Sequence, residues 1–248
     1  MKTNIVTKGE SNENPPILIL HGWGASTKSW EKVQNELSNL RYKVIVPDMP
    51  GFGESAPPEK PWTSDDYLSW LLGFIKEQKI TTPFYLVGHS FGGSLALKLA
   101  IKHPELIRKL IVISAARSGH AKTSLKVRVI KRIVRIGKST EKLPFFKLMR
   151  KAFYKFIVQE RDYERTEGVM RKTMELVLKD NLTHDLHKIH LPTLIIWGEN
   201  DKATPIEDAH VINHEIKGSE LRIVKGGKHA INLTHPYEVS EFIYKFLK

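Results

Sequence analysis

Short apolar runs alternate with amphipathic stretches along most of this chain. Six segments have the length of a strand, at residues 17–20, 44–46, 84–87, 110–113, 193–197 and 220–224. The stretches between them repeat apolar residues every three or four positions, as helices do. Strands that are apolar on both faces and separated by helices indicate a parallel sheet covered on both sides. The pattern therefore predicts an α/β fold.

One long interval interrupts this alternation. Residues 117–190 show no strand pattern, and their apolar positions follow helical spacing, as at Leu125 and Val129. We therefore expect a core domain made of residues 1–116 and 191–248. Between two of its strands we expect an all-helical insertion of residues 117–190.

Composition limits which classes of protein this chain can belong to. A chain of 248 residues can bury one sizeable core. It has no cysteine, which excludes disulfides, thiol catalysis and thiolate metal sites. No segment approaches the roughly 18 apolar residues of a membrane span, and the first residues lack the apolar stretch of a secretory signal. We expect a cytoplasmic protein without a transmembrane segment, and favour a monomer.

The net charge of +12 is concentrated in the insertion. Residues 117–190 contain 19 Lys and Arg against 8 Asp and Glu, whereas the rest of the chain contains 20 against 19. The positive charge is therefore a property of one segment and not of the whole surface.

Candidate chemistry begins at Gly88-His89-Ser90-Phe91-Gly92, which has the form Gly-x-Ser-x-Gly. The motif directly follows the apolar run 84–87 and opens a helical stretch, which is the strand-turn-helix setting of a nucleophile elbow. The alternative is a glycine-rich connection without a catalytic role. In the elbow, Ser90 is the nucleophile, and a Cβ at either glycine would meet neighbouring backbone. The Phe91 N–H, at a helix N-terminus, would stabilise an oxyanion.

A serine nucleophile needs a general base. Among 11 histidines, we favour His229, which follows the run 220–224 through Gly226-Gly227-Lys228 and precedes the last helix. His235 stands beside Pro236 at a helix start, where capping explains it better. Most of the other histidines sit on polar segments that suit a solvated side chain.

The third member should orient the imidazole from the end of another strand. Asp201 lies just beyond the run 193–197. Asp208 is already on the next helix, and Glu199 is too close to the strand to reach across. The order Ser90, Asp201, His229 is the order of α/β hydrolases and differs from that of other triad folds.

Over nearly its whole length the chain resembles the α/β-hydrolase family. The matching motifs are His21-Gly22-Trp23-Gly24, Asp48-Met49-Pro50-Gly51-Phe52-Gly53-Glu54-Ser55, Gly88-His89-Ser90-Phe91-Gly92-Gly93, Trp197-Gly198-Glu199-Asn200-Asp201 and Gly226-Gly227-Lys228-His229. The resemblance implies a mostly parallel sheet flanked by helices, with the insertion as a cap over the active site. It also implies that Trp23 supplies a second oxyanion N–H, although packing alone would explain its indole. No metal or organic cofactor is needed. One departure is the short N-terminus, which leaves room for one strand before Ile17.

Within the family, a serine at position 90 argues against haloalkane dehalogenases and epoxide hydrolases, whose nucleophile is an aspartate. The motifs most resemble the carboxylesterase branch that acts on pimeloyl-acyl-carrier-protein methyl ester. Meta-cleavage-product hydrolases, which cut carbon–carbon bonds, share the architecture. We expect hydrolysis of small-molecule esters with small to medium, mainly apolar acyl groups, with carbon–carbon cleavage as the alternative. A non-catalytic binding protein of this fold is disfavoured because all three triad positions are filled.

The insertion would determine the substrate. Its apolar residues would either roof a pocket or only seal the cap onto the core. The expected pocket residues are His21, Gly22, Trp23, Phe91, Phe145, Met149 and Phe153. The basic face has three interpretations: a solvated surface, a docking site for an acidic carrier protein or substrate, or contact with an anionic membrane surface. Nucleic-acid binding is disfavoured because no recognised motif accompanies the charge.

Overall fold

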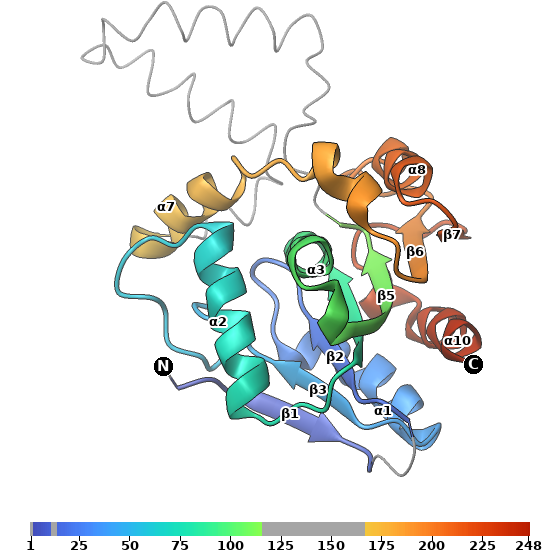
Figure 1. The fold of residues 1–248 in the computed structure, drawn as a ribbon, viewed down its shortest axis with the longest axis horizontal. Helices are drawn as coiled ribbons and strands as arrows, with labels where there is room; N and C mark the ends of the chain where they lie inside the picture. The colour runs from blue at the N-terminus through green and yellow to red at the C-terminus, as the bar shows by residue number, and fades with distance from the viewer. Residues whose placement is uncertain (1, 11–13, 116–166) are drawn as a thin grey trace, which may run out of the picture.

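The computed structural model describes residues 2–10, 14–115 and 167–248 (Figure 1). Within these residues, seven strands form one sheet in the order β1-β3-β2-β4-β5-β6-β7. The strands are β1 (Ile5–Lys8), β2 (Ile17–Leu20), β3 (Val44–Pro47), β4 (Phe84–His89), β5 (Ile107–Ile113), β6 (Thr193–Gly198) and β7 (Glu220–Val224). β1 runs antiparallel to β3, and the other pairs are parallel. The predicted mostly parallel α/β sheet is confirmed.

Helices connect the strands and cover both faces of the sheet. The α-helices are α1 (Glu31–Asn39), α2 (Ser64–Glu77), α3 (Phe91–Lys102), α7 (Gly168–Val177), α8 (Ile206–Glu215), α9 (Ile231–Thr234) and α10 (Pro236–Leu247). Short 3₁₀ turns are η1 (Thr27–Trp30), η2 (Pro104–Leu106) and η4 (Thr183–Lys188). Figure 1 shows α2 and α3 beside each other over the sheet.

The alternation of side chains along each strand divides the core into two layers. In β2, Leu18 and Leu20 belong to the apolar cluster that includes residues of α2, α3 and α8, and Ile17 and Ile19 to the cluster of α1 and α10. Successive residues of a strand point to opposite faces, so a strand covered on both faces must be apolar throughout. This is the physical reason for the continuous apolar runs in the sequence.

Two details differ from or extend the sequence pattern. β1, the strand expected before Ile17, pairs with β3 at the edge of the sheet. β5 begins at Ile107, before the apolar run, because its polar start is part of the ladder. There the Lys109 ammonium donates to the Phe246 carbonyl oxygen at 2.6 Å, so a charged residue sits in the strand with a partner.

The order of the strands reverses between β2 and β4. After β2 the chain adds β3 on one side, and it then returns to add β4 on the other side. Leu20 and Gly88, near the carboxyl ends of these two strands, are partners in the ladder. Ligands of open α/β sheets bind at such a reversal, beyond the carboxyl ends of the strands. The loops that follow β2 and β4 therefore form the expected location of a site.

The segment 167–190, the described part of the predicted insertion, consists of helical turns. α7 lies against the turn after β3, where Met170 packs directly on Gly51. Leu186 of η4 and the following Ile189 are part of the apolar core. Residues 116–166 lie outside the described residues, so the division into core and cap stays a prediction. None of the described helices is long and apolar enough to cross a membrane.

Candidate active site

The turn between β4 and α3 holds Ser90 in an uncommon backbone conformation. Its φ is 52° and its ψ is −117°, and a positive φ is strained for a residue with a side chain. A Cβ at Gly88 would lie 2.4 Å from the Gly92 carbonyl oxygen, and one at Gly92 would lie 2.3 Å from the Leu20 carbonyl oxygen. The prediction that both glycines are required by neighbouring backbone is confirmed.

The structure brings Ser90, His229 and Asp201 together in a line of hydrogen bonds. His229 Nε2 lies 3.0 Å from Ser90 Oγ, and His229 Nδ1 lies 2.9 Å from Asp201 Oδ2. A carboxylate only accepts, so Nδ1 carries a proton. In the neutral ring, Nε2 is then the bare nitrogen and accepts the hydroxyl proton of Ser90. The three residues follow β4, β6 and β7, whose carboxyl ends lie at one edge of the sheet.

Asp201 is the most enclosed of the three, and its side chain is fully buried. Besides His229, it accepts from the backbone N–H groups of Ala203 and Thr204 at 2.8 and 3.0 Å. Burial, the largest single influence, would raise the pKa of Asp201, but the hydrogen bonds from His229 and Thr204 outweigh it and lower the pKa. Asp201 is therefore a stable anion at the far end of the histidine.

Thr204 is a residue of the site that the sequence pattern did not single out. Its hydroxyl lies 2.8 Å from Asp201 Oδ2 and 3.3 Å from His229 Nδ1, and it also approaches the Ser114 carbonyl oxygen at 3.2 Å. The available signal was the spacing Asp-x-x-Thr, because an aspartate often binds backbone N–H groups two or three residues ahead in a turn. Thr204 therefore contacts both Asp201 and His229 and helps to hold the carboxylate beside the imidazole.

The loop that carries His229 is anchored by the residues before Asp201. Glu199 Oε2 accepts from the Gly226 N–H at 2.8 Å, and the Asn200 N–H donates to the Gly227 carbonyl oxygen at 2.7 Å. Glu199, which we did not favour as the triad acid, thus binds the backbone of the loop and not the imidazole of His229. His235, the alternative base, begins α10 without a side-chain capping bond, so the expected cap is not formed.

Trp23 and Phe91, the predicted oxyanion donors, lie side by side. Their ring centres are 5.4 Å apart, and Phe52 approaches Trp23 at 4.8 Å. Phe91 is the first residue of α3, where backbone N–H groups have no intrahelical acceptor. The indole of Trp23 thus packs in an aromatic cluster next to the nucleophile, and the roles of the two N–H groups stay predictions.

The side chain of His21, a predicted pocket residue, is bound by backbone groups, and its role in a pocket stays a prediction. It is fully buried; its Nδ1 donates to the Gly22 carbonyl oxygen at 2.8 Å and its Nε2 accepts from the Met49 N–H at 2.9 Å. Burial lowers the pKa of His21 more than its partners raise it, which keeps the ring neutral. Gly22 itself lies against the nucleophile, since a Cβ there would be 3.2 Å from Ser90 Cβ. Phe145, Met149 and Phe153 lie outside the described residues.

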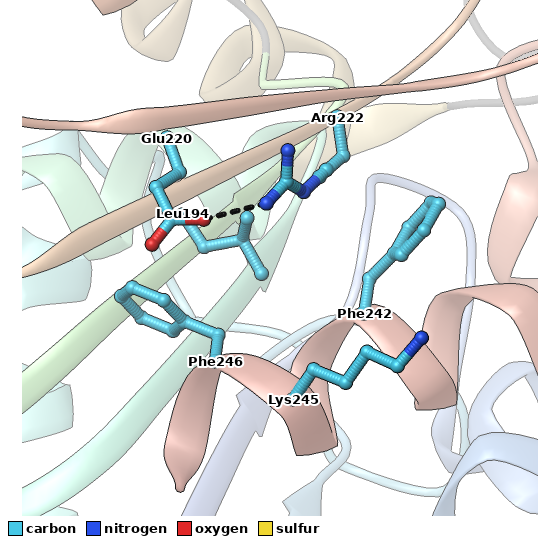
Figure 2. A pocket seen from close by; sticks show the side chains of 6 residues that line it. All are labelled: Leu194, Glu220, Arg222, Phe242, Lys245 and Phe246. Carbon is cyan, nitrogen blue, oxygen red and sulfur yellow. Dashed lines mark hydrogen bonds and ion pairs between the residues drawn. The ribbon is translucent and has the colours of Figure 1, made fainter.

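A separate hollow of about 290 Å³ lies between the sheet and α10 (Figure 2). It is lined by Leu194, Glu220, Arg222, Phe242, Lys245 and Phe246. Leu194 and Glu220 stand at the amino ends of their strands, so the hollow lies away from the triad. Arg222 pairs with Glu220 at 2.9 Å and Lys245 with Glu241 at 2.6 Å, so both cations have partners. Among the described residues, no three His, Asp or Glu side chains are grouped to hold a metal ion.

Comparisons with known proteins agree with this geometry. Residues 15–165 match the family described as "alpha/beta hydrolase fold". A 2-hydroxy-6-oxo-6-(2'-aminophenyl)hexa-2,4-dienoic acid hydrolase of Metapseudomonas resinovorans is 27% identical, over 96% of this chain and 86% of its own. Lipase 1 of Psychrobacter immobilis is 24% identical, over 86% of this chain and 71% of its own. A solved serine hydrolase involved in carbazole degradation is 26% identical, with a TM-score of 0.73 over 99% of this chain and 94% of that one.

Proposed function

Because the chain belongs to the α/β-hydrolase family and is a hydrolase, we propose that it cleaves carboxylic esters with small to medium, mainly apolar acyl groups. The observation that carries the proposal is the continuous hydrogen-bond line from Ser90 through His229 to Asp201. A hydroxyl, a base and a buried anion in this order are what acyl transfer to serine requires.

In the proposed reaction, His229 Nε2 takes the hydroxyl proton while Ser90 Oγ attacks the ester carbonyl. The Trp23 and Phe91 N–H groups donate to the oxyanion of the tetrahedral intermediate. The intermediate collapses, and His229 returns its proton to the leaving alcohol, which leaves an acyl group on Ser90. A water then repeats the two steps and releases the acid. Every proton transfer of the proposed reaction therefore passes through His229 Nε2.

Asp201 supports these steps without exchanging a proton itself. Its carboxylate holds Nδ1–H of His229, which selects the tautomer whose Nε2 can accept. When His229 takes the serine proton, the adjacent anion offsets the new positive charge. Thr204 adds a hydroxyl donor to the same carboxylate oxygen, so the anion keeps its direction toward the imidazole.

The aromatic cluster beside Ser90 supports an apolar acyl group. Phe91 contacts Trp23 and also Tyr67, whose ring centre is 5.0 Å away. The Tyr67 hydroxyl donates to the Pro50 carbonyl oxygen at 2.9 Å, so its polar end is used inside the protein. Sites lined by aromatic rings bind apolar parts of a ligand, and a few polar groups orient it. The likeness to a lipase agrees with this preference.

Carbon–carbon bond hydrolysis is the second candidate. It is favoured by the relative whose printed substrate is a hydroxy-oxo-dienoic acid. Such a substrate carries a carboxylate, which needs a cation near the site. The Lys and Arg residues of the predicted insertion would supply it.

A direct experiment compares these candidates. Hydrolysis of p-nitrophenyl butyrate is measured for the wild-type protein, Ser90→Ala and His229→Ala, beside turnover of a meta-cleavage diketone. We expect ester turnover that both substitutions abolish. Undiminished ester hydrolysis in either variant would contradict the triad. Turnover of the diketone without ester hydrolysis would favour the second candidate.

The basic insertion calls for its own measurement. We propose that it attracts an acidic carrier protein, to which the physiological ester is attached. We propose further that the enzyme is cytoplasmic and monomeric. The rates on a free methyl ester and on a carrier-protein-linked methyl ester are compared from low to high ionic strength. Clustered charge predicts a preference for the linked ester that decreases with salt. A preference that does not depend on salt would leave the insertion a solvated surface.

A further inference from the structure

His89, the residue before the nucleophile, is buried beside the triad and has no part in the reaction described above. It is 6% exposed. Its Nε2 lies 2.9 Å from the main-chain carbonyl oxygen of His229. The two imidazole rings have centres 4.9 Å apart and are inclined by 44°. His89 therefore contacts both the backbone and the ring of the general base.

The protonation of His89 follows from its partners. A carbonyl oxygen only accepts, so His89 Nε2 carries the proton and donates. Burial, together with the neighbouring His229, lowers the pKa of His89 to about 3, so the ring is neutral and its Nδ1 is bare. A Cβ at Gly22 would lie 3.0 Å from that Nδ1, and Trp30 meets the ring edge-on at 6.3 Å. The ring is enclosed on several sides, and its donor has a fixed direction.

The contacts of His89 and Ser90 complement each other. Ser90 Oγ binds Nε2 of His229, and His89 binds the carbonyl of the same residue, 140 positions later in the chain. Other anchors of the His229 loop act at Gly226 and Gly227, and Asp201 binds the second nitrogen of the imidazole. Two successive residues of one strained turn thus hold the base at both its ring and its backbone.

We propose that His89 is a positioning residue, whose Nε2–H holds the His229 carbonyl and so fixes the distance between base and nucleophile. The inference rests on the proposed function, because it matters only if His229 is the base for Ser90. An error of about 1 Å in such a distance is enough to slow a reaction roughly 10²-fold. The bond adds nothing to substrate binding, so its loss should appear in kcat and not in KM.

Two variants of matched size separate the hydrogen bond from the space that the ring fills. His89→Gln keeps an N–H donor at the end of the side chain, whereas His89→Met has similar length without a donor. For His89→Met we expect kcat on p-nitrophenyl butyrate to fall about 10- to 100-fold, with KM changed less than about threefold. For His89→Gln we expect kcat within about fivefold of the wild-type value.

A second readout does not depend on the ester. A fluorophosphonate that labels activated serines reports how well His229 activates Ser90, whatever the substrate is. The labelling rate should fall in His89→Met and recover in His89→Gln, with thermal unfolding followed in parallel. Wild-type rates in His89→Met, or equal losses in both variants at unchanged thermal stability, would overturn the inference. Labelling that depends on Ser90 without any ester turnover would count against the proposed substrate and leave His89 to be judged on labelling alone.

If both variants fail to fold, the wild-type protein still tests the bond. ¹⁵N-labelled histidines report their tautomer and their titration in NMR spectra. We expect one histidine that stays neutral from pH 5 to 8 with its proton on Nε2, as His89 requires. Buried His21 is distinguishable because its proton is on Nδ1. Absence of a non-titrating Nε2–H histidine would overturn the inference.

Discussion

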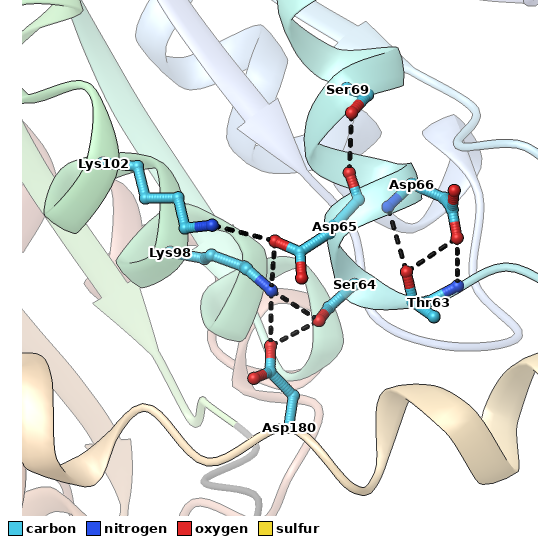
Figure 3. Close-up of polar contacts among 8 residues, drawn as sticks. All are labelled: Thr63, Ser64, Asp65, Asp66, Ser69, Lys98, Lys102 and Asp180. Carbon is cyan, nitrogen blue, oxygen red and sulfur yellow. Dashed lines mark hydrogen bonds and ion pairs between the residues drawn. The ribbon is translucent and has the colours of Figure 1, made fainter.

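Helix α3 carries two clusters of polar side chains that differ in what they leave accessible. At its first turn lies the triad of Ser90, His229 and Asp201. Two turns later, Lys98 is 4% exposed, and its ammonium donates to Ser64 Oγ, Asp65 Oδ1 and Asp180 Oδ2 at 2.8 to 2.9 Å (Figure 3). Three donors meet three acceptors, so the ammonium is fully satisfied.

The difference lies in what each cluster leaves open. In the triad, the His229 side chain is 22% exposed, and the Ser90 hydroxyl is only partly buried, so a reacting group can approach. In the ionic cluster, Lys98 is paired with both Asp65 and Asp180. They join the start of α2, the middle of α3 and the segment after α7, where Ser64 also donates to Asp180. One cluster can change its protonation during a reaction, whereas the other holds three distant segments together.

The largest expected effect is on the rate, from a change in the triad. Ser90→Ala should reduce kcat on p-nitrophenyl butyrate by roughly 10⁵–10⁶-fold, because the other triad members then have no nucleophile to activate. Its thermal unfolding should change little, since one partly buried hydroxyl is lost. Ser69→Ala, on the exposed side of α2, is the control and should keep the wild-type rate. A large loss of stability in Ser90→Ala would remove the contrast between the clusters.

The next effect is on stability, from a change in the ionic cluster. Lys98→Met leaves Asp65 and Asp180 without their shared cation. Removing one partner of a buried pair costs about 3–5 kcal/mol, and we expect roughly 2–4 kcal/mol because both carboxylates keep some contact with water. Urea unfolding measures this, and the activity of the folded fraction should stay within about fivefold of the wild-type value.

Lys102→Met is the matched control for Lys98→Met. Its side chain is 50% exposed and pairs with Asp65 at 3.0 Å. An exposed pair contributes about 0–1 kcal/mol, so this variant should unfold close to the wild-type protein. Equal losses in the two lysine variants would show that burial of Lys98 does not set the importance of the cluster.

A smaller effect is expected from Thr204, which supports the triad from one side. Thr204→Val removes the hydroxyl donor to Asp201 while keeping the shape of the side chain. A hydrogen bond to a charged group contributes about 1.5–3 kcal/mol, part of which is realised in the reaction. We expect kcat to fall roughly 10-fold, and Thr204→Ser to restore most of it. Equal kcat values for the valine and serine variants would show that the hydroxyl has no role in the reaction.

The smallest effect concerns acid stability. The pKa values of Asp201 and Asp65 are lower in the folded protein than usual. For Asp201, burial raises the pKa, but the hydrogen bonds from His229 and Thr204 outweigh it. For Asp65, the main cause is the hydrogen bond from Lys98. A lowered pKa means that the stability from these anions is present above the ordinary aspartate range near pH 4. It is lost as the pH falls through the lowered values. Urea unfolding of wild type and Asp201→Asn from pH 7 to 3 should therefore converge in acid. Curves that stay parallel would contradict this.

Several features of the site were predictable from the sequence because they depend on nearby residues. The apolar runs predicted six of the seven strands of the described sheet, because a strand covered on both faces has no polar side. The glycines around Ser90 predicted a crowded turn, and a Cβ at either position meets backbone. Even the placement of Asp201 and His229 required only that each follow a strand end.

Other contacts depend on residues that are far apart in the chain. The pairing of His89 with the His229 carbonyl, the burial of His21 against Met49 and the meeting of Lys98 with Asp180 have no local signature. They exist because β2 and β4 are neighbours at the reversal of strand order and because the chain returns to α3 after α7. The sequence by itself determined the strands, the strained turn and the order of the candidate triad. Only the tertiary structure decided which buried polar group faces which, since that depends on the order and register of strands and on the packing of helices over them.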